Sequence, residues 1–143
     1  MTKLWHVYIR AGIAYIPVVA KTVAGFYLEI EPVAVVQVSD KPALIKTLEN
    51  VGAEGIPAVP TPPRESFSKP VVMQRAEEKS WGKFARSTEL WNISLDDLCY
   101  EVTGTKLEGT GWVPDPSRIF SISTELGLSG VADIIIGDKS LPS

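Results

Sequence analysis

Few side chains in this 143-residue sequence have the chemistry of a catalytic or metal-binding group. His6 is the only histidine and Cys99 is the only cysteine. Zinc sites are built mainly from several histidine and cysteine ligands, so an ordinary zinc site is nearly excluded. The spacing does not forbid a Cys99–His6 pair acting as nucleophile and base. Cys99 has no activating neighbour, however, and His6 lies within an alternating apolar stretch, so we interpret both as structural residues.

Carboxylates are the other groups that could do chemistry. Three pairs stand close together in the sequence: Glu29/Glu31, Glu77/Glu78 and Asp96/Asp97. The two-residue spacing of Glu29 and Glu31 places both on one face of a strand. Acid–base catalysis would require one carboxyl group to sit in an apolar pocket. A small enzyme or ligand-binding domain with Glu29 or Glu31 in a deep, aromatic-walled pocket therefore stays open as an alternative.

Cofactor-binding motifs are absent. The sequence contains no phosphate loop, dinucleotide fingerprint or nucleophile elbow. The glycine-rich stretch at 104–111 has no lysine directly after Gly109, where a phosphate loop has one, and no following helix, so we interpret it as a turn. We expect neither a cofactor nor a metal.

The composition indicates one globular domain over residues 1–143, with 45% hydrophobic and 22% charged residues. A single cysteine cannot form an internal disulfide. The N-terminus lacks the apolar core of a signal peptide, and no apolar run is long enough to span a membrane. We therefore expect a cytoplasmic protein. The formal net charge of −3 argues against an evenly basic nucleic-acid binder.

Alternating residues predict strands in the first part of the chain. Strands are expected at 4–9, with Trp5, Val7 and Ile9 on one side, and at 13–20, 26–31 and 33–38. Pro17 indicates an edge or a bulge. A helix is expected from a cap at Ser39 or Asp40 to about Gly52, with a core-facing stripe that includes Leu44, Leu48 and Val51.

The middle of the chain is rich in proline. Five of the eleven prolines fall within residues 55–70, which predicts an extended surface loop or a linker. We favour a loop anchored by Ile56, Val59 and Phe67. A short strand is expected at 71–73. Ser80 is expected to cap a short helix that places Trp81 and Phe84 on one face.

A hairpin is the strongest local prediction in the second half. A two-residue Asp96–Asp97 loop would pair Leu95 with Leu98, Ile93 with Tyr100 and Trp91 with Val102, all on one apolar face. A longer loop is the alternative. Turns around Trp112 are expected at 103–118, then a last strand at 119–122 and a helix from a Ser129 cap to Gly137. These elements predict an α+β fold, mostly an antiparallel sheet with two or three helices packed against it.

Charge is distributed unevenly along the chain. Residues 1–86 carry a net charge of +3, whereas residues 87–143 carry −6. The acidic second half is either a solvated surface or a patch that captures a basic partner. The candidate binding residues are Asn92, Asp96, Asp97, Glu101, Glu108, Trp112 and Asp115.

Several segments resemble a set of small bacterial proteins. These segments are YIP at 15–17, AKTVAGFYLEIEPV at 20–33, VPTPPR at 59–64, KPVV at 69–72 and KSWGKF at 79–84. The resemblance extends over about residues 4–136 and is to the immunity proteins of contact-dependent growth inhibition systems. It implies a cytoplasmic, non-enzymatic inhibitor that binds a toxin domain, expected to be a basic tRNA-cleaving nuclease, in a 1:1 complex. The matching segments are mostly turn and core residues, so no catalytic residue is carried over.

Two other functions remain open at this point. One is the small carboxylate-dependent enzyme or ligand-binding domain described above. The other is a structural or interaction module that associates with itself through the sheet edge near Pro17. A nuclease inhibitor is expected to bind its partner through the acidic surface and to bind neither nucleic acid directly nor a membrane.

Overall fold

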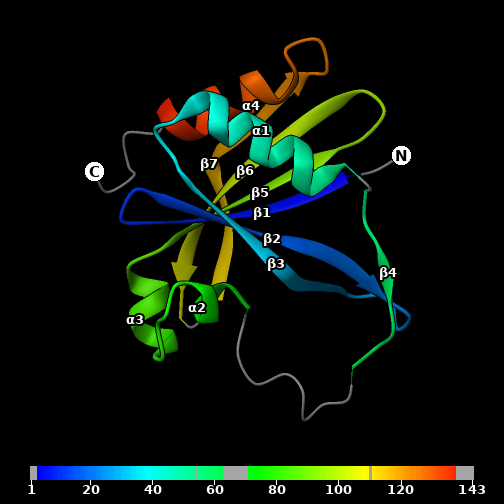
Figure 1. Cartoon of the computed structure of the whole chain (residues 1–143). Helices are drawn as coiled ribbons and strands as arrows, with labels where there is room; N and C mark the ends of the chain where they lie inside the picture. The colour runs from blue at the N-terminus through cyan, green and yellow to red at the C-terminus, as the bar shows by residue number, and fades with distance from the viewer. Residues whose placement is uncertain (1–2, 54, 63–70, 110, 138–143) are drawn as a thin grey trace.

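The computed structural model describes residues 3–53, 55–62, 71–109 and 111–137, in which seven strands form one sheet and four helices pack against it (Figure 1). The strands are β1 (Lys3–Arg10), β2 (Ile13–Thr22), β3 (Tyr27–Gln37), β4 (Ala58–Val59), β5 (Glu89–Leu95), β6 (Cys99–Glu108) and β7 (Gly111–Ser123). The helices are α1 (Lys41–Gly52), α2 (Val71–Arg75), α3 (Trp81–Arg86) and α4 (Gly127–Gly137). The α+β class is confirmed, with four helices where the sequence predicts two or three. Within these residues, no helix has both the length and the apolar character to cross a membrane.

The sheet has the strand order β3-β2-β1-β5-β6-β7, and each strand is antiparallel to its neighbours. The antiparallel arrangement predicted for the first strands is therefore confirmed, and the two strands expected at 26–31 and 33–38 are one strand, β3. The first residues of β2 pair with β1, from Ile13↔Arg10 to Tyr15↔Tyr8. The rest of β2 pairs with β3, and its last two residues also pair with β4. The register shifts between Pro17 and Val18, in the part of β2 that has no β1 partner. This confirms the bulge expected at Pro17.

The larger core lies between the sheet and helices α1 and α4 (Figure 1). Trp5, Val7 and Ile9 of β1 are buried on this face, as their alternation predicts. Helix α1 begins after Asp40, whose carboxylate accepts the Ala43 N–H at 3.2 Å. The helix buries Leu44 and Leu48 as predicted, while α4 contributes Val131, Ala132 and Ile135.

A second core lies on the opposite face of β1, where α2 and α3 cover Tyr8 and Leu90. Helix α3 begins after Ser80, whose hydroxyl accepts the Lys83 N–H, and it buries Phe84. The cap and the aromatic face are thus confirmed. The strand expected at 71–73 is wrong, because these residues start helix α2 and bury Val72 and Met73. Burial of these side chains against the second core outweighs the weak strand preference of a short β-branched run.

The β5–β6 hairpin differs from the prediction by a two-residue shift in register. The observed pairs are Leu95↔Tyr100, Ile93↔Val102 and Trp91↔Gly104. A shift of two residues keeps every side chain on its predicted face, so the apolar pattern alone could not distinguish the two registers. The connection is the three-residue segment Asp96–Leu98, as in the alternative of a longer loop, and Leu98 is 82% exposed instead of being paired in the core.

The turns expected at 103–118 are wrong, because strands β6 and β7 form a long hairpin through this region. The register shifts between Thr103 and Thr105, which places Gly104 at a bulge. Pro114 and Pro116 are tolerated because β7 is the edge strand of the sheet. The strand expected at 119–122 is the end of β7. Helix α4 begins at Gly127, two residues before the predicted Ser129 cap, and ends at Gly137 as expected.

The described part of the proline-rich segment is mostly irregular. Its only regular element is β4, which pairs in parallel with Lys21 and Thr22 of β2 and covers the end of that strand. The half-buried side chains of Ile56 and Val59 agree with their predicted anchoring role. Phe67, the third anchor expected from the sequence, lies outside the described residues.

Candidate functional site

The seven predicted binding residues do not form one surface. Asp96 and Asp97 lie at the β5–β6 turn, whereas Glu108 lies at the opposite end of β6. At the rise of an extended strand, the ten residues of β6 separate these positions by about 30 Å. A single compact site therefore cannot contain them all.

The β5–β6 turn forms an acidic end of the sheet. Cys99 pairs with Ser123, so the β5–β6 turn lies beside the turn that links β7 to α4. Both turns expose a leucine, with Leu98 82% and Leu126 63% exposed. We define the acidic end by the exposed residues Asp96, Asp97, Leu98, Glu101, Glu125 and Leu126. It combines negative charge with exposed apolar side chains, as a protein-binding surface does.

Asp96 gives this turn a defined shape. Its carboxylate accepts the Leu98 N–H at 2.8 Å and the Cys99 N–H at 2.9 Å. These backbone hydrogen bonds, that from Cys99 first, lower the pKa of Asp96 below its ordinary value. Asp96 therefore supports the turn, and Asp97 and Glu101 are exposed beside it.

The opposite end of the molecule contains a cleft of about 520 Å³ between α3 and the β6–β7 hairpin. One wall is formed by the end of α3 and the chain that follows it, from Ala85 to Glu89. The other wall consists of Thr105, Lys106, Leu107, Trp112 and Arg118. Its volume falls within the range of small-molecule sites.

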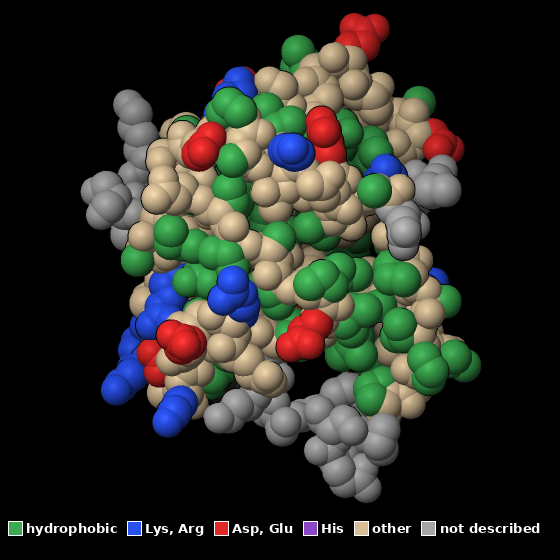
Figure 2. All heavy atoms as spheres, in the orientation of Figure 1, with side chains coloured by type: hydrophobic (Ala, Val, Ile, Leu, Met, Phe, Trp, Pro, Cys, Tyr) green, Lys and Arg blue, Asp and Glu red, His purple; other side chains and the backbone are tan. Residues whose placement is uncertain are grey.

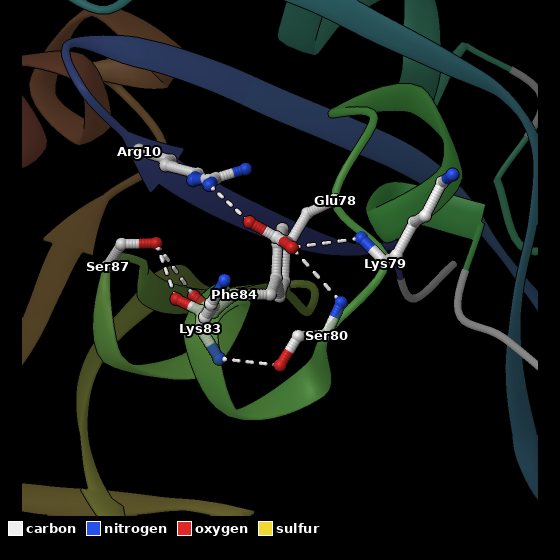
Figure 3. A network of polar contacts seen from close by, with 7 residues as sticks. All are labelled: Arg10, Glu78, Lys79, Ser80, Lys83, Phe84 and Ser87. Carbon is white, nitrogen blue, oxygen red and sulfur yellow. Dashed lines mark hydrogen bonds and ion pairs between the residues drawn. The ribbon is translucent and has the colours of Figure 1, made fainter.

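Helix α3 is tied to β1 by the polar network in Figure 3. Arg10 at the end of β1 donates to Glu78 at 2.9 Å, and the other oxygen of Glu78 accepts the N–H groups of Lys79 and Ser80. Ser80 then caps the helix. At the far end, the Ser87 hydroxyl donates to a backbone carbonyl of α3 at 2.8 Å. Both ends of this six-residue helix are thus fixed, and with them one wall of the cleft.

Arg118 is the best-connected side chain of the other wall. It forms ion pairs with Asp115 at 3.2 Å and Glu89 at 3.5 Å, and its guanidinium lies 5.2 Å from the centre of the Trp91 ring. Gly104 makes room for it, because a Cβ there would lie 2.9 Å from the guanidinium carbon. Asp115, a predicted partner-binding residue, is therefore engaged within the protein. The Ser117 hydroxyl and N–H, together with Arg118, lower the pKa of Asp115.

Trp112 and Asn92 are also placed differently from the prediction. Trp112 is half-buried and makes edge-on contacts with Tyr8 and Trp81, at ring distances of 5.8 and 5.4 Å. It lines the cleft while belonging to the second core. Asn92 lies in the middle of β5, and its buried side-chain oxygen has no hydrogen-bond partner among the described residues. Neither residue belongs to the acidic end.

The cleft has a positive character in a chain whose net charge is −3. Its lining includes three cationic side chains, Arg86, Lys106 and Arg118, and one carboxylate, Glu89. In Figure 2, lysine and arginine side chains gather at the lower left, over α3. Within the described residues, Arg86 and Lys106 form no ion pair. Thr88 is only 7% exposed, and its hydroxyl has no hydrogen-bond partner among the described residues.

Glu29 interacts with two side chains of β1. One oxygen of its carboxylate lies 2.6 Å from His6 Nδ1 and accepts the Tyr8 hydroxyl at 2.5 Å. Burial raises the pKa of Tyr8, and the neighbouring Glu29 raises it further, so the hydroxyl stays protonated and donates. Glu29 does not line the cleft.

The described residues contain no group of three histidine, cysteine or acidic side chains that could hold a metal.

Sequence reasoning missed most of the cleft. Arg86 ends α3, Thr88 lies between α3 and β5, Lys106 is in β6 and Arg118 is in β7, and nothing in their spacing predicts that they meet. Asp115 and Arg118 form an i,i+3 ion pair, but that spacing predicts a contact on a helix and not in a strand such as β7. The exposure of Leu98 was missed because the predicted register placed it in the core.

The whole fold is similar to that of two solved structures. Neither a protein-family model nor a curated protein matches the sequence. A protein of unknown function, NMB0488 from Neisseria meningitidis, superimposes with a TM-score of 0.70 at 12% identity, covering 99% of this chain and 96% of that one. A chain of the CdiA-CT/CdiI toxin and immunity complex from Yersinia pseudotuberculosis superimposes with a TM-score of 0.68 at 8% identity, covering 100% and 98%.

Proposed function

We propose that this protein is an immunity protein that binds and inhibits a toxin of a contact-dependent growth inhibition system. The observation that carries the proposal is the similarity of its entire fold to a chain of a toxin and immunity complex. Such a protein acts by binding, without turnover, and it acts in the cytoplasm of the cell that it protects. The expected partner is a basic, tRNA-cleaving nuclease domain bound in a 1:1 complex.

The acidic end is the surface proposed to bind the toxin. A nuclease active site must attract phosphate, so its surface carries positive charge that a carboxylate-rich inhibitor complements. Asp97, Glu101 and Glu125 supply the charge, and Leu98 and Leu126 supply exposed apolar contacts beside it. The proposed toxin-binding surface does not include Trp112, which packs against the second core, or Asp115, which forms an ion pair with Arg118.

The direct test uses the toxin domain encoded beside the gene for this protein. The purified domain should form a stable 1:1 complex with the protein, and its cleavage of tRNA should stop in that complex. Expression of the protein should also protect cells that produce the toxin. A toxin that neither binds the protein nor loses its activity would contradict the proposed function.

Charge reversal tests the proposed surface separately. The double variant Asp97→Lys/Glu101→Lys should weaken toxin binding by roughly tenfold or more at low salt, and by less at high salt, because screening already removes part of the attraction there. Asp96 is left unchanged because it holds the turn. The matched control is Glu31→Lys/Glu108→Lys, which makes the same change in net charge at exposed positions elsewhere. Equal losses in both variants would exclude the acidic end as the binding surface.

A further inference from the structure

We propose that the cleft between α3 and the β6–β7 hairpin binds a small phosphorylated ligand of nucleotide size. No part of the proposed inhibitor function requires this site, and the cleft lies at the opposite end of β6 from the acidic end. The inference rests on the charge of the lining, on one buried hydroxyl group and on the size of the space.

The charge of the lining selects an anion. Arg118 is neutralised by Asp115 and Glu89, which leaves Arg86 and Lys106 as cations without an ion-pair partner among the described residues. The two residues lie on opposite walls, one at the end of α3 and one on β6. An anion between them would satisfy both charges. The last carbonyls of α3 do not oppose this arrangement strongly, because Ser87 already donates to them through its N–H and its hydroxyl.

The Thr88 hydroxyl is a further donor that lacks a partner among the described residues. A buried hydroxyl without a partner is destabilising, and such groups are rare in native proteins. Thr88 lines the cleft between Ser87 and Glu89. A phosphate group offers three terminal oxygens, enough for one hydrogen bond from the hydroxyl and one contact with each of two cations. A phosphate monoester also carries a charge of about −1.5 to −2 at pH 7, which balances two cations better than the single charge of a carboxylate does.

The volume indicates a group larger than phosphate. A space of about 520 Å³ is far larger than an inorganic phosphate ion requires. Ala85, Leu107 and the half-buried Trp112 give the cleft an apolar and aromatic part beside its cations. A nucleoside monophosphate matches this combination, since its flat base can contact the aromatic side chain while its phosphate meets the cations.

The first measurement is calorimetric titration of the protein alone with AMP, inorganic phosphate and adenosine. AMP should bind with a dissociation constant on the order of 1 mM or below, more tightly than phosphate, and adenosine should bind least. Absence of AMP binding up to about 10 mM would overturn the proposal, as would equal binding of AMP and adenosine. Because no toxin is present, this result is independent of the proposed function.

Two variants locate the binding site. Arg86→Gln/Lys106→Gln should weaken AMP binding by roughly tenfold or more, because it removes both charge-assisted contacts. The control Arg75→Gln/Lys83→Gln removes two exposed cations from α2 and α3 outside the cleft, and it should leave affinity unchanged. Equal losses in the two variants would show nonspecific attraction and overturn the assignment.

Thr88→Val separates a ligand-binding role from a packing role. The substitution keeps the shape and removes the unpartnered hydroxyl, so the free protein should become more stable while AMP binding weakens several-fold. A variant that is more stable but binds AMP as the parent does would overturn the assignment of Thr88 as a donor.

An oligoribonucleotide with a 5′-phosphate, compared with the same oligomer ending in a hydroxyl, distinguishes an RNA end from a free nucleotide as the source of the phosphate.

Discussion

The contact between Gly52 and Trp5 gives a sharp stability prediction. A Cβ at position 52 would lie 2.4 Å from Trp5 Cζ2 and 2.9 Å from Nε1, well inside the normal carbon–carbon contact distance. Trp5 cannot move away easily, because it is 1% exposed and its indole N–H donates to the Leu48 carbonyl at 2.9 Å. Gly52→Ala must therefore displace either the indole ring or the end of α1.

Helix propensity and packing predict opposite effects for this substitution. Replacing glycine by alanine inside a helix stabilises it by about 1 kcal/mol, and by less at the last helical residue. Overpacking a core typically costs about 1 to 3 kcal/mol, and loss of the buried indole hydrogen bond adds about 1 kcal/mol or more. Packing outweighs propensity here, so we expect Gly52→Ala to lower the free energy of unfolding by about 2 kcal/mol.

Urea unfolding followed by circular dichroism measures this change directly. At the size of this domain, the same destabilisation corresponds to a decrease in Tm of about 4 to 8 °C. Gly137→Ala is the matched control, because Gly137 also ends a helix and a Cβ there meets no atom of the described residues within 4 Å. It should be neutral or slightly stabilising. If Gly52→Ala were as stable as Gly137→Ala, the contact with Trp5 would be too soft to support this reasoning.

Two carboxylate substitutions should also change stability. Glu29→Gln removes the charge that accepts the Tyr8 hydroxyl and contacts His6, and it should cost about 1 to 2 kcal/mol in urea unfolding. The pKa of Glu78 is lowered from 4.5, first by the Ser80 N–H and then by the Arg10 side chain. A lowered folded-state pKa means that the stabilisation is present above pH 4.5 and is lost as the pH falls below it. Glu78→Gln should therefore lower stability at neutral pH and flatten its decline in acid.

Neighbouring glutamates provide the controls for both substitutions. Glu31→Gln removes an exposed charge two residues along β3 from Glu29, and Glu77→Gln removes one next to Glu78. Both should leave the unfolding midpoint nearly unchanged. A loss in Glu31→Gln as large as that in Glu29→Gln would argue against the contact with Tyr8. If the stability of Glu78→Gln fell with decreasing pH as that of the parent does, Glu78 would not contribute to acid unfolding.

Local patterns predicted the elements whose signals lie within a few residues. The alternation of Trp5, Val7 and Ile9, the Asp40 cap and the Ser80 cap are all properties of short segments. The β6–β7 hairpin was missed because its glycines and prolines resemble turn residues until the sheet order is known. In the structure, β7 is an edge strand, which tolerates prolines, and Gly104 of β6 packs against the Arg118 side chain. Whether glycine and proline are tolerated in these strands therefore depends on contacts between distant segments, which local sequence patterns do not reveal.

Gly52 shows a related limit. The sequence suggests glycine as a helix stop, which is ordinarily a matter of backbone freedom. In the structure, Ala53 follows Gly52 in a right-handed helical conformation. The nearby Trp5 side chain leaves no space for a Cβ at position 52. The residue type was correctly singled out, but its reason is a contact between segments 47 positions apart.

The candidate site shows why charge along a sequence is a poor guide to charge on a surface. The acidic second half suggested one negative patch, yet Asp97 and Glu101 lie near one end of β6, whereas Glu108 lies at the other end beside the cationic Lys106. The two ends lie about 30 Å apart, several times the screening length of about 8 Å at physiological salt. Each end therefore acts on a ligand almost as if the other were absent. A net charge of −3 is thus compatible with an acidic surface that attracts a basic protein and a cationic cleft that attracts an anion.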